Sequence, residues 1–322
     1  MARNTKKFHL ILDFDGTIIK NNTIPLLDYL RQDQNDISYG SFLDPYLRDY
    51  TEHVKNYQPS QEKRVTLQQE YDYLDSLGSV EKRSIERIES SGWLKGLKWT
   101  PEENSAFDTA VSHIGHNETL VWRTGFADLV KTIWQSHGMV DILSVNWSGN
   151  FIRALLRHEF GGAIDIDRIG LYSNEIDPSG TGRFSRVKWK SQDHFVNHWL
   201  RDSDQEDEDS RGIWTAQDKA LVMRAVTATS KANNMITIYV GDSKTDLRSI
   251  MEADIGVCIE DNIDPTAEQV SLKEVFDRLA IDRIPIGNSL YVGEKRSKDQ
   301  DQLVYHAQDF NKVRKALLGC TE

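Results

Sequence analysis

Residues 9–17, His-Leu-Ile-Leu-Asp-Phe-Asp-Gly-Thr, constrain the fold of this chain more than any other stretch. The apolar run at residues 10–12 is typical of a strand that is buried on both faces of a parallel sheet. The run stops at Asp13 and Asp15, and ligands of open α/β sheets bind beyond the carboxyl ends of the strands. The stretch therefore predicts a parallel α/β fold with two carboxylates at the edge of a ligand site.

The spacing of these two aspartates suits phosphoryl chemistry. Side chains two residues apart in an extended chain lie on the same side, so Asp13 and Asp15 can address one substrate. One carboxylate can attack a phosphoryl group and split hydrolysis into two easier steps, while the other transfers the proton. Gly16 permits a sharp turn away from the site. The alternative is a plain Asp-Gly turn in which Asp15 bonds only the local backbone.

A strand that ends in Asp-x-Asp-Gly-Thr resembles the first motif of the haloacid dehalogenase (HAD) superfamily of phosphohydrolases. The resemblance implies that Asp13 is the nucleophile, that Asp15 is the general acid and base, and that Thr17 lies beside the substrate. It also implies a doubly wound, Rossmann-like parallel sheet. Three further motifs follow in the order that the family has them, which extends the resemblance over residues 13–246.

The second motif falls at the carboxyl end of a predicted strand, residues 140–145. Ser144 matches a family hydroxyl that hydrogen-bonds a phosphate oxygen, and Val145 and Asn146 would join it in binding the substrate. Backbone N–H groups of the following turn and helix start could hold the same anion. The alternative is a serine that bonds only local backbone. Trp147 could stack on an aromatic leaving group, or simply pack against the core.

The third motif is a lysine that neutralises the phosphoryl group and the nucleophile. Lys219 matches it, in the first turns of a helix predicted to begin after Trp214. A helix dipole does not favour a cation there, so helix stability does not explain this lysine. An exposed, solubilising lysine is the simpler interpretation, and Lys188 and Lys190 are rival candidates from a predicted hairpin.

The fourth motif, Gly-Asp-x-x-x-Asp, ends the predicted strand within residues 236–246 and binds magnesium in the family. Mg²⁺ prefers oxygen ligands, commonly one or two carboxylates with water and phosphate oxygen. The resemblance therefore implies a Mg²⁺ site built from four carboxylates, those of Asp13, Asp15, Asp242 and Asp246. The alternative is a pair of helix-stabilising acids, with Asp242 as N-cap and Asp246 in the first turn.

Residues 24–115 predict a helical insertion, because apolar residues recur at helical spacing and no strand-like run interrupts them. The position resembles the small helical cap of the phosphoserine-phosphatase-like branch of the superfamily. The predicted α/β catalytic core then comprises residues 1–23 and 116–322. The alternative is a helical lobe with a purely structural role.

The composition of the 322 residues excludes several classes of protein. A net charge of -11 argues against a nucleic-acid partner, and no apolar run is long enough to predict a membrane span. The basic start has no apolar segment with a cleavage site, so it does not predict a signal peptide. Cys258 and Cys320 do not form a disulfide framework, which favours a cytoplasmic location. The acidic run 202–210 predicts a solvated loop.

Together these features predict a Mg²⁺-dependent phosphomonoesterase that hydrolyses a small phosphorylated metabolite through an aspartyl-phosphate intermediate. Two other functions use the same residues. One is a phosphotransferase or phosphomutase with the same aspartates, and the other is a catalytically silent HAD-like binding protein. Turnover of a generic phosphate ester would separate the silent binding protein from the two kinds of enzyme.

Overall fold

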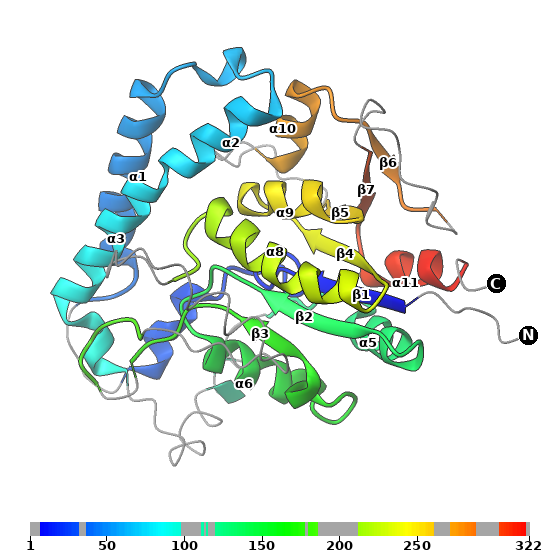
Figure 1. Ribbon diagram of the computed structural model, residues 1–322. Coiled ribbons are helices and arrows are strands. Elements are labelled where there is room, and N and C mark those ends of the chain that lie inside the picture. The colour runs from blue at the N-terminus through cyan, green and yellow to red at the C-terminus, as the bar shows by residue number, and fades with distance from the viewer. Residues whose placement is uncertain are drawn as a thin grey trace, which may run out of the picture.

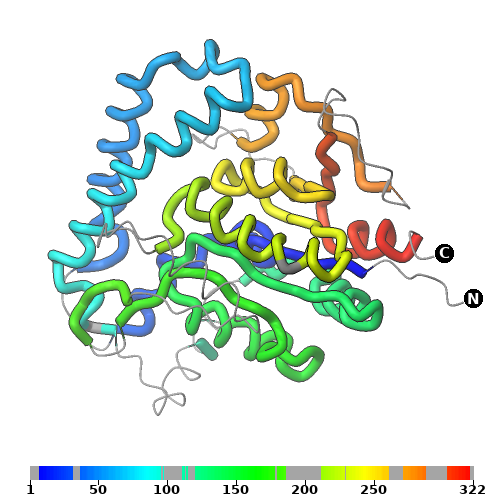
Figure 2. Tube along the Cα trace, in the orientation of Figure 1, coloured from blue at the N-terminus to red at the C-terminus, as the bar shows by residue number. Residues whose placement is uncertain are grey.

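Figure 2 traces the computed structural model, which describes residues 7–31, 37–97, 111–112, 114, 120–177, 180–185, 212–260, 271–287 and 303–319. The rival lysines Lys188 and Lys190, the acidic run 202–210 and Cys320 lie outside the described residues. No helix in the described ranges is long and apolar enough to cross a membrane.

A seven-stranded sheet, in which all paired strands run parallel, forms the centre of the described chain (Figure 1). The strands have the order β3-β2-β1-β4-β5-β7-β6. They are β1 (Lys7–Leu12), β2 (Met139–Leu143), β3 (Gly170–Tyr172), β4 (Met235–Gly241), β5 (Ile255–Ile259), β6 (Arg283–Pro285) and β7 (Val304–Ala307). The chain winds outward from β1 in one direction and returns to β4 on its other side. The carboxyl ends of β1 and β4 therefore flank the switch point, where ligands of such sheets bind.

Helices cover both faces of the sheet, so the predicted parallel α/β fold is confirmed. One face carries α8 (Ala216–Ala232), α9 (Leu247–Glu252) and α10 (Leu272–Arg278), and the other carries α5 (Phe126–Gln135), α6 (Gly149–Phe160) and α11 (Phe310–Leu318). Side chains alternate along a strand, which divides the core into two clusters. Phe8, Leu10 and Leu12 of β1 belong to one cluster and Ile11 to the other.

The regular elements described between residues 24 and 97 are all helices, and an isolated β-bridge joins Arg31 to Leu97. The helices are η1 (Ile24–Leu30), α1 (Gly40–Asn56), η2 (Gln61–Lys63), α2 (Leu67–Ser76), α3 (Gly78–Ser91) and η3 (Trp93–Gly96). In Figure 1, α1, α2 and α3 form an arch along one side of the core. At one end of the arch, the Tyr71 ring lies 4.4 Å below the Arg248 guanidinium and Asp75 lies 3.4 Å from it.

The helical segment leaves and rejoins the core at one place. The N–H of Lys20 donates to the carbonyl of Val121 at 2.8 Å, and the N–H of Arg123 donates to Ile18 at 2.9 Å. Ile19 and Trp122 form a β-bridge between these contacts. Both connections are therefore held side by side, next to the turn that follows β1.

Two helix ends depend on local contacts of single residues. Helix α3 starts at Gly78 with no side-chain cap, because the Ser79 hydroxyl donates to Ser76 instead of capping the helix. After α5 the residue in the left-handed conformation is His137, with φ 58°, and not the glycine that follows it. Gly138 is needed for packing, because a Cβ would lie 2.4 Å from the Phe8 carbonyl oxygen.

Candidate active site

Three of the predicted site residues follow neighbouring strands at the same edge of the sheet. Asp13 follows β1, Ser144 follows β2 and Asp242 follows β4. The registers place Leu12 beside Ile142 on one side and beside Val240 on the other. Because the three strands are parallel and adjacent, their carboxyl ends bring these three side chains to one place.

Lys219 extends from the second turn of α8 into this cluster. Its Nζ lies 2.9 Å from Oδ1 of Asp13 and donates to Oδ1 of Asp246 at 2.6 Å. The contact with Asp13 is an ion pair whose angle is not that of a hydrogen bond, so Asp13 Oδ1 has no aligned donor. The side chain is fully buried, which excludes the alternative of an exposed, solubilising lysine. Burial alone would lower the pKa of Lys219, but the two carboxylates raise it and keep the ammonium charged.

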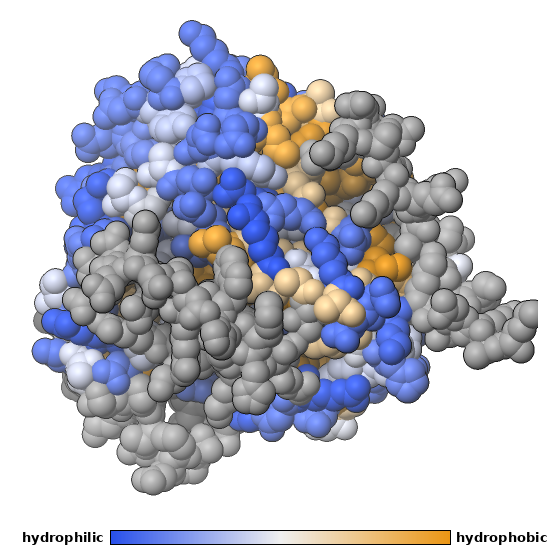
Figure 3. Space-filling view, in the orientation of Figure 1, coloured by the Kyte–Doolittle hydropathy of each residue, from blue (hydrophilic) through white to orange (hydrophobic). Residues whose placement is uncertain are grey.

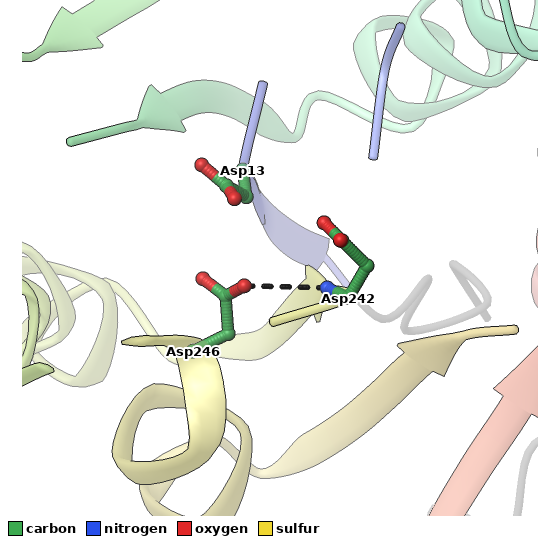
Figure 4. Close-up of side chains that lie close together, drawn as sticks. All are labelled: Asp13, Asp242 and Asp246. Atoms are coloured by element: carbon green, nitrogen blue, oxygen red, sulfur yellow. Dashed lines mark hydrogen bonds between the residues drawn. The ribbon is translucent and has the colours of Figure 1, made fainter. Parts of the chain in front are cut away.

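Asp246 is the best-satisfied carboxylate of the cluster. Its Oδ1 accepts from Lys219 and from the Tyr239 hydroxyl, which lies 2.7 Å away. Its Oδ2 accepts from the N–H and hydroxyl of Ser243, at 3.0 and 2.9 Å, and from the N–H of Asp242 at 3.2 Å (Figure 4). Burial opposes ionisation, but Lys219 and these donors outweigh it and lower the pKa of Asp246. Asp246 therefore holds Lys219 and the turn after β4 in place.

Asp13 and Asp242 have the opposite electrostatic balance. Carboxylate oxygens of Asp13, Asp242 and Asp246 all lie within 4.8 Å of one another (Figure 4). Burial and the Asp246 charge raise the pKa of Asp242 to about 7, and the same two causes raise that of Asp13 against the pull of Lys219. Lys219 thus contacts two of the three clustered carboxylates, and the pKa values of Asp13 and Asp242 are raised above that of an ordinary aspartate.

Asp15 lies on the same turn but outside this cluster. Its Oδ1 accepts from the N–H of Thr23 and its Oδ2 from the side-chain amide of Asn146, both at 2.7 Å. The same amide donates to the Thr23 hydroxyl at 2.9 Å. Burial raises the pKa of Asp15, and these hydrogen bonds oppose the rise without cancelling it. The structure therefore joins two predicted site residues, Asp15 and Asn146, by a direct contact.

The turn after β1 is shaped by its contacts with Asp242 and Arg123. Gly16 has φ 76°, and a Cβ would lie 2.2 Å from Oδ2 of Asp242, so only glycine fits. The Thr17 hydroxyl donates to Oδ1 of Asp242 at 2.7 Å. Buried Arg123 donates to the carbonyls of Gly16, Thr17 and Gln308 at 2.6, 2.8 and 2.8 Å. Thr17 thus supports Asp242, and Arg123 fixes the turn that carries Asp15.

The turn after β2 is also held from outside. The side-chain amide of Asn174 donates to the carbonyls of Val145, Asn146 and Ile213, at 3.2, 3.2 and 2.9 Å. The Ser144 hydroxyl accepts from the N–H of Asn146 at 3.2 Å. Asn174 therefore ties the turn that carries Ser144 to the segment that leads into α8.

The sequence had suggested that N–H groups at the start of α6 could hold an anion. In the structure these groups already have partners within the protein. The Ser148 side chain caps the helix and accepts from Phe151 at 3.1 Å. Glu175 accepts from the Asn150 N–H at 2.9 Å and from the Ser148 hydroxyl at 2.7 Å. A carboxylate of the protein already occupies this helix terminus.

Trp147 packs into the core and is 9% exposed. Its ring centroid lies 5.7 Å from that of Tyr39, and 5.9 Å from those of Trp93 and Phe184. These rings contact Trp147 from several sides. Trp147 is therefore a packing residue of the core, and its ring is not free to stack on an aromatic leaving group.

Sequence reasoning had named no role for three of these residues, Arg123, Asn174 and Tyr239. Arg123 carried a local signal, because it opens an Arg-x-Gly-Phe stretch that resembles the same branch of the family. Asn174 and Tyr239 carried none, since each acts through partners that only the fold brings close.

Comparison with known proteins gives distant relatives. No family model matches the sequence. The chain is 24% identical over 317 residues to a CTO1 family protein of Schizosaccharomyces pombe. This match covers 96% of this chain and 99% of that protein. The chain is also 22% identical over 234 residues to the mitochondrial bifunctional TH2 protein of Arabidopsis thaliana, covering 70% of this chain. The match spans 31% of that larger protein.

Among solved structures, the chain is similar to a substrate-bound phosphoserine phosphatase, with 13% identity and a TM-score of 0.41 over 80% of this chain and 87% of the other. It is also similar to a phosphoserine phosphohydrolase-like protein from Francisella tularensis, with 13% identity and a TM-score of 0.39 over 95% and 97% of the two chains. Likeness at this level identifies no substrate. The parallel α/β fold and the acidic cluster at its carboxyl edge are what define this molecule.

Proposed function

We propose that this chain is a magnesium-dependent phosphomonoesterase of the HAD type, which hydrolyses a small phosphorylated metabolite through an aspartyl-phosphate. The observation that carries the proposal is the contact between Asp13 and Lys219 at the end of the central strand, beside Asp242. Phosphoryl transfer depends mainly on positioning and on electrostatic stabilisation. A strand-end carboxylate with a buried ammonium and a second carboxylate beside it supplies both.

A divalent cation fits the site because the carboxylates exceed the positive charge in contact with them. Asp13 and Asp242 are the two whose pKa values are raised, and carboxylate oxygen is the ligand that Mg²⁺ prefers. We assign these two side chains to the metal. Asp246 would act in support, since all its contacts already hold Lys219 and the turn after β4. A bound Mg²⁺ would polarise the phosphoryl oxygens and offset their charge.

In this mechanism an oxygen of Asp13 attacks phosphorus and the ester bond breaks. Asp15 gives its proton to the leaving oxygen, and its raised pKa favours the protonated form that this step requires. Asp15 then takes a proton from the water that cleaves the aspartyl-phosphate, which restores both carboxyl groups. Its oxygens face Thr23 and Asn146, which favours proton transfer over the predicted role as a metal ligand.

Charge and hydrogen bonds would hold the phosphoryl group during both steps. Lys219 neutralises it together with the nucleophile. The Ser144 hydroxyl and the Val145 N–H lie on the turn next to Asp13, and Val145 donates to no described residue. Asn146 and Thr17 act through Asp15 and Asp242 respectively.

Residues 24–115 would form a cap that closes over this site. Two contacts support this role. Tyr39, just before α1, lies against Trp147 beside the site, and α2 packs against α8, which carries Lys219. Because both connections of the segment are held together beside the turn after β1, that place could serve as the hinge about which the arch moves.

The experiment is to measure phosphate release from p-nitrophenyl phosphate and from a panel of phosphorylated metabolites. Asp13→Asn should lower turnover at least about a thousandfold, since the amide keeps the shape and loses the nucleophile. Chelation should abolish activity in the wild type, Mg²⁺ should restore it and Ca²⁺ should restore little, because Ca²⁺ adopts looser geometry. Asp167→Asn, at an exposed surface ion pair, is the matched control.

Near-wild-type turnover in a folded Asp13→Asn variant would contradict the proposal, and so would full activity after exhaustive chelation. Product analysis with added alcohol acceptors separates hydrolysis from phosphotransfer, because a transferase would yield a new ester in place of inorganic phosphate.

A further inference from the structure

A carboxylate without a cation faces the interior between α1 and α3. Glu81 of α3 accepts a hydrogen bond from the Tyr46 hydroxyl of α1 at 2.9 Å. Within the described residues, no lysine or arginine forms an ion pair with Glu81, although α3 also carries Arg83 and Arg87, which pair with Asp49. Burial and the charge of Asp218 raise the pKa of Glu81 to about 7, despite the bond from Tyr46. An uncompensated carboxylate costs free energy, so its presence calls for a role.

Two contacts place this carboxylate beside the candidate active site. Helix α3 begins next to the segment that enters α8, because a Cβ on Gly78 would lie 3.8 Å from the Thr215 side chain. Glu81 follows one turn later, and Asp218, which acts on its pKa, precedes Lys219. Glu81 therefore lies on the side of the arch that faces the start of α8.

Tyr39, directly before the first residue of α1, approaches the same region. Its ring lies 5.7 Å from Trp147, the neighbour of Asn146, which bonds Asp15. Burial raises the pKa of Tyr39, and the charges of Asp15 and Glu81 add to the rise, so both carboxylates are near enough to act on this tyrosine. The leaving oxygen that Asp15 protonates would thus face Tyr39 and Glu81.

The side chains around Glu81 suit a cation. Tyr46 stacks on Tyr50 with ring centroids 6.2 Å apart, and the faces of tyrosine rings attract positive charge. An anionic group would meet both Glu81 and Asp218, with no described lysine or arginine paired to Glu81 to offset them. The surroundings therefore favour a positively charged ligand and oppose an acidic one.

We propose that Glu81 recognises a positively charged nitrogen on the leaving group, so that the preferred substrates are phosphate monoesters of amino or quaternary ammonium alcohols. This inference rests on the proposed phosphatase function, with the phosphoryl group at Asp13 and the nitrogen toward Glu81. Glu81 touches no reacting atom and acts as a specificity residue.

The test uses ω-aminoalkyl phosphates of increasing chain length, each paired with the methyl-terminated alkyl phosphate of equal length. At the best length, wild type should prefer the amine about tenfold or more in kcat/KM, as expected for one partly buried charge pair. Glu81→Gln retains the shape and can still accept from Tyr46, and it should reduce this ratio to near one. Glu86→Gln, on the exposed face of the same helix, should leave the ratio as it is.

Binding provides a readout that does not depend on turnover. In the Asp13→Asn background, calorimetry should show the amine ester binding about tenfold more tightly than its partner, and Glu81→Gln should remove the difference. A preference near one at every length, or a preference that Glu81→Gln does not change, overturns the inference. If p-nitrophenyl phosphate is not hydrolysed, the proposed function fails, while the binding comparison still decides on Glu81.

Discussion

Arg123 shows how a residue that bears no reactive group can decide the geometry of a site. Its guanidinium donates to three backbone carbonyls, two of them in the turn that follows Asp15. Arginine presents several donors in a fixed plane, whereas lysine offers a single point charge. On its other side, the turn at Gly16 lies in close contact with Asp242. If the hydrogen bonds from Arg123 are lost, the turn therefore cannot relax without displacing Asp242 or Asp15.

Arg123→Lys should therefore lower kcat by about a hundredfold, because misplacing a catalytic group by about 1 Å has an effect of this size. The melting temperature should fall as well, since buried carbonyls lose donors. Steady-state kinetics and thermal unfolding measure the two effects. Arg157→Lys, at an exposed pair with Asp167, is the control and should change neither. An Arg123→Lys enzyme with unaltered kcat would show that the turn keeps its shape alone.

At the scale of elements, a buried polar chain joins two strands and a helix. His9 of β1 contacts Asp141 of β2 through Nε2 at 2.8 Å, and Ser230 of α8 through Nδ1. The set resembles the Ser-His-Asp arrangement of hydrolases, but Ser230 is 0% exposed and no substrate could reach it. Its role is therefore to fix α8, and with it Lys219, against the sheet.

His9→Leu should lower the free energy of unfolding by about 3 kcal/mol, because it leaves the Asp141 carboxylate buried without its partner. Ser230→Ala should cost less and should not reduce phosphate release. Chemical denaturation gives the first quantity and a turnover assay the second. Loss of turnover in a stable Ser230→Ala protein would mean that the hydroxyl takes part in chemistry.

The sequence predicted those parts of the site that short motifs encode. Asp13, Ser144 and Asp242 follow recognisable strands, and Lys219 lies near the start of a recognisable helix. The parallel sheet brings the three strand ends together. Asn174 could not be predicted in this way, because its partners lie far along the chain and are contacted only after folding.

Helix α1 lies within the segment predicted to be helical, although the sequence analysis did not mark it as a separate helix. Its exposed side is polar, as the hydrophilic surface over the arch in Figure 3 shows, and Pro45 interrupts its hydrogen bonding. Its buried side is largely aromatic, with Tyr46 and Tyr50 among the residues that face the arch.

The stability of the whole molecule should depend on pH through Glu81. Its pKa is about 7 in the folded protein and 4.5 in a free chain, so the folded state binds more protons between these values. Stability is then lost as pH rises from about 4.5 through 7. Glu81→Gln should remove this part of the dependence, at most about 3 kcal/mol, since one pKa unit corresponds to about 1.4 kcal/mol.

Urea denaturation of wild type and Glu81→Gln across this pH range measures the effect as a difference, which cancels the contributions of other groups. The free energy of unfolding of the variant should increase relative to that of the wild type as the pH rises. A constant difference would show that Glu81 ionises normally. An added amine ester should reduce the gap at neutral pH, because a cation beside Glu81 favours its charged form.

The strand order has a consequence for how the chain is made. The central strand β1 is synthesised first, yet its neighbours begin at Met139 and Met235. At a synthesis rate of roughly 5 to 20 residues per second, an apolar strand waits some tens of seconds for its second neighbour. During that time the arch, β2 and β3 emerge behind it, so β1 can pair only on its β2 side. A ribosome that stalls before β4 therefore releases a chain whose central strand has an open edge, which makes the nascent protein a client for chaperones.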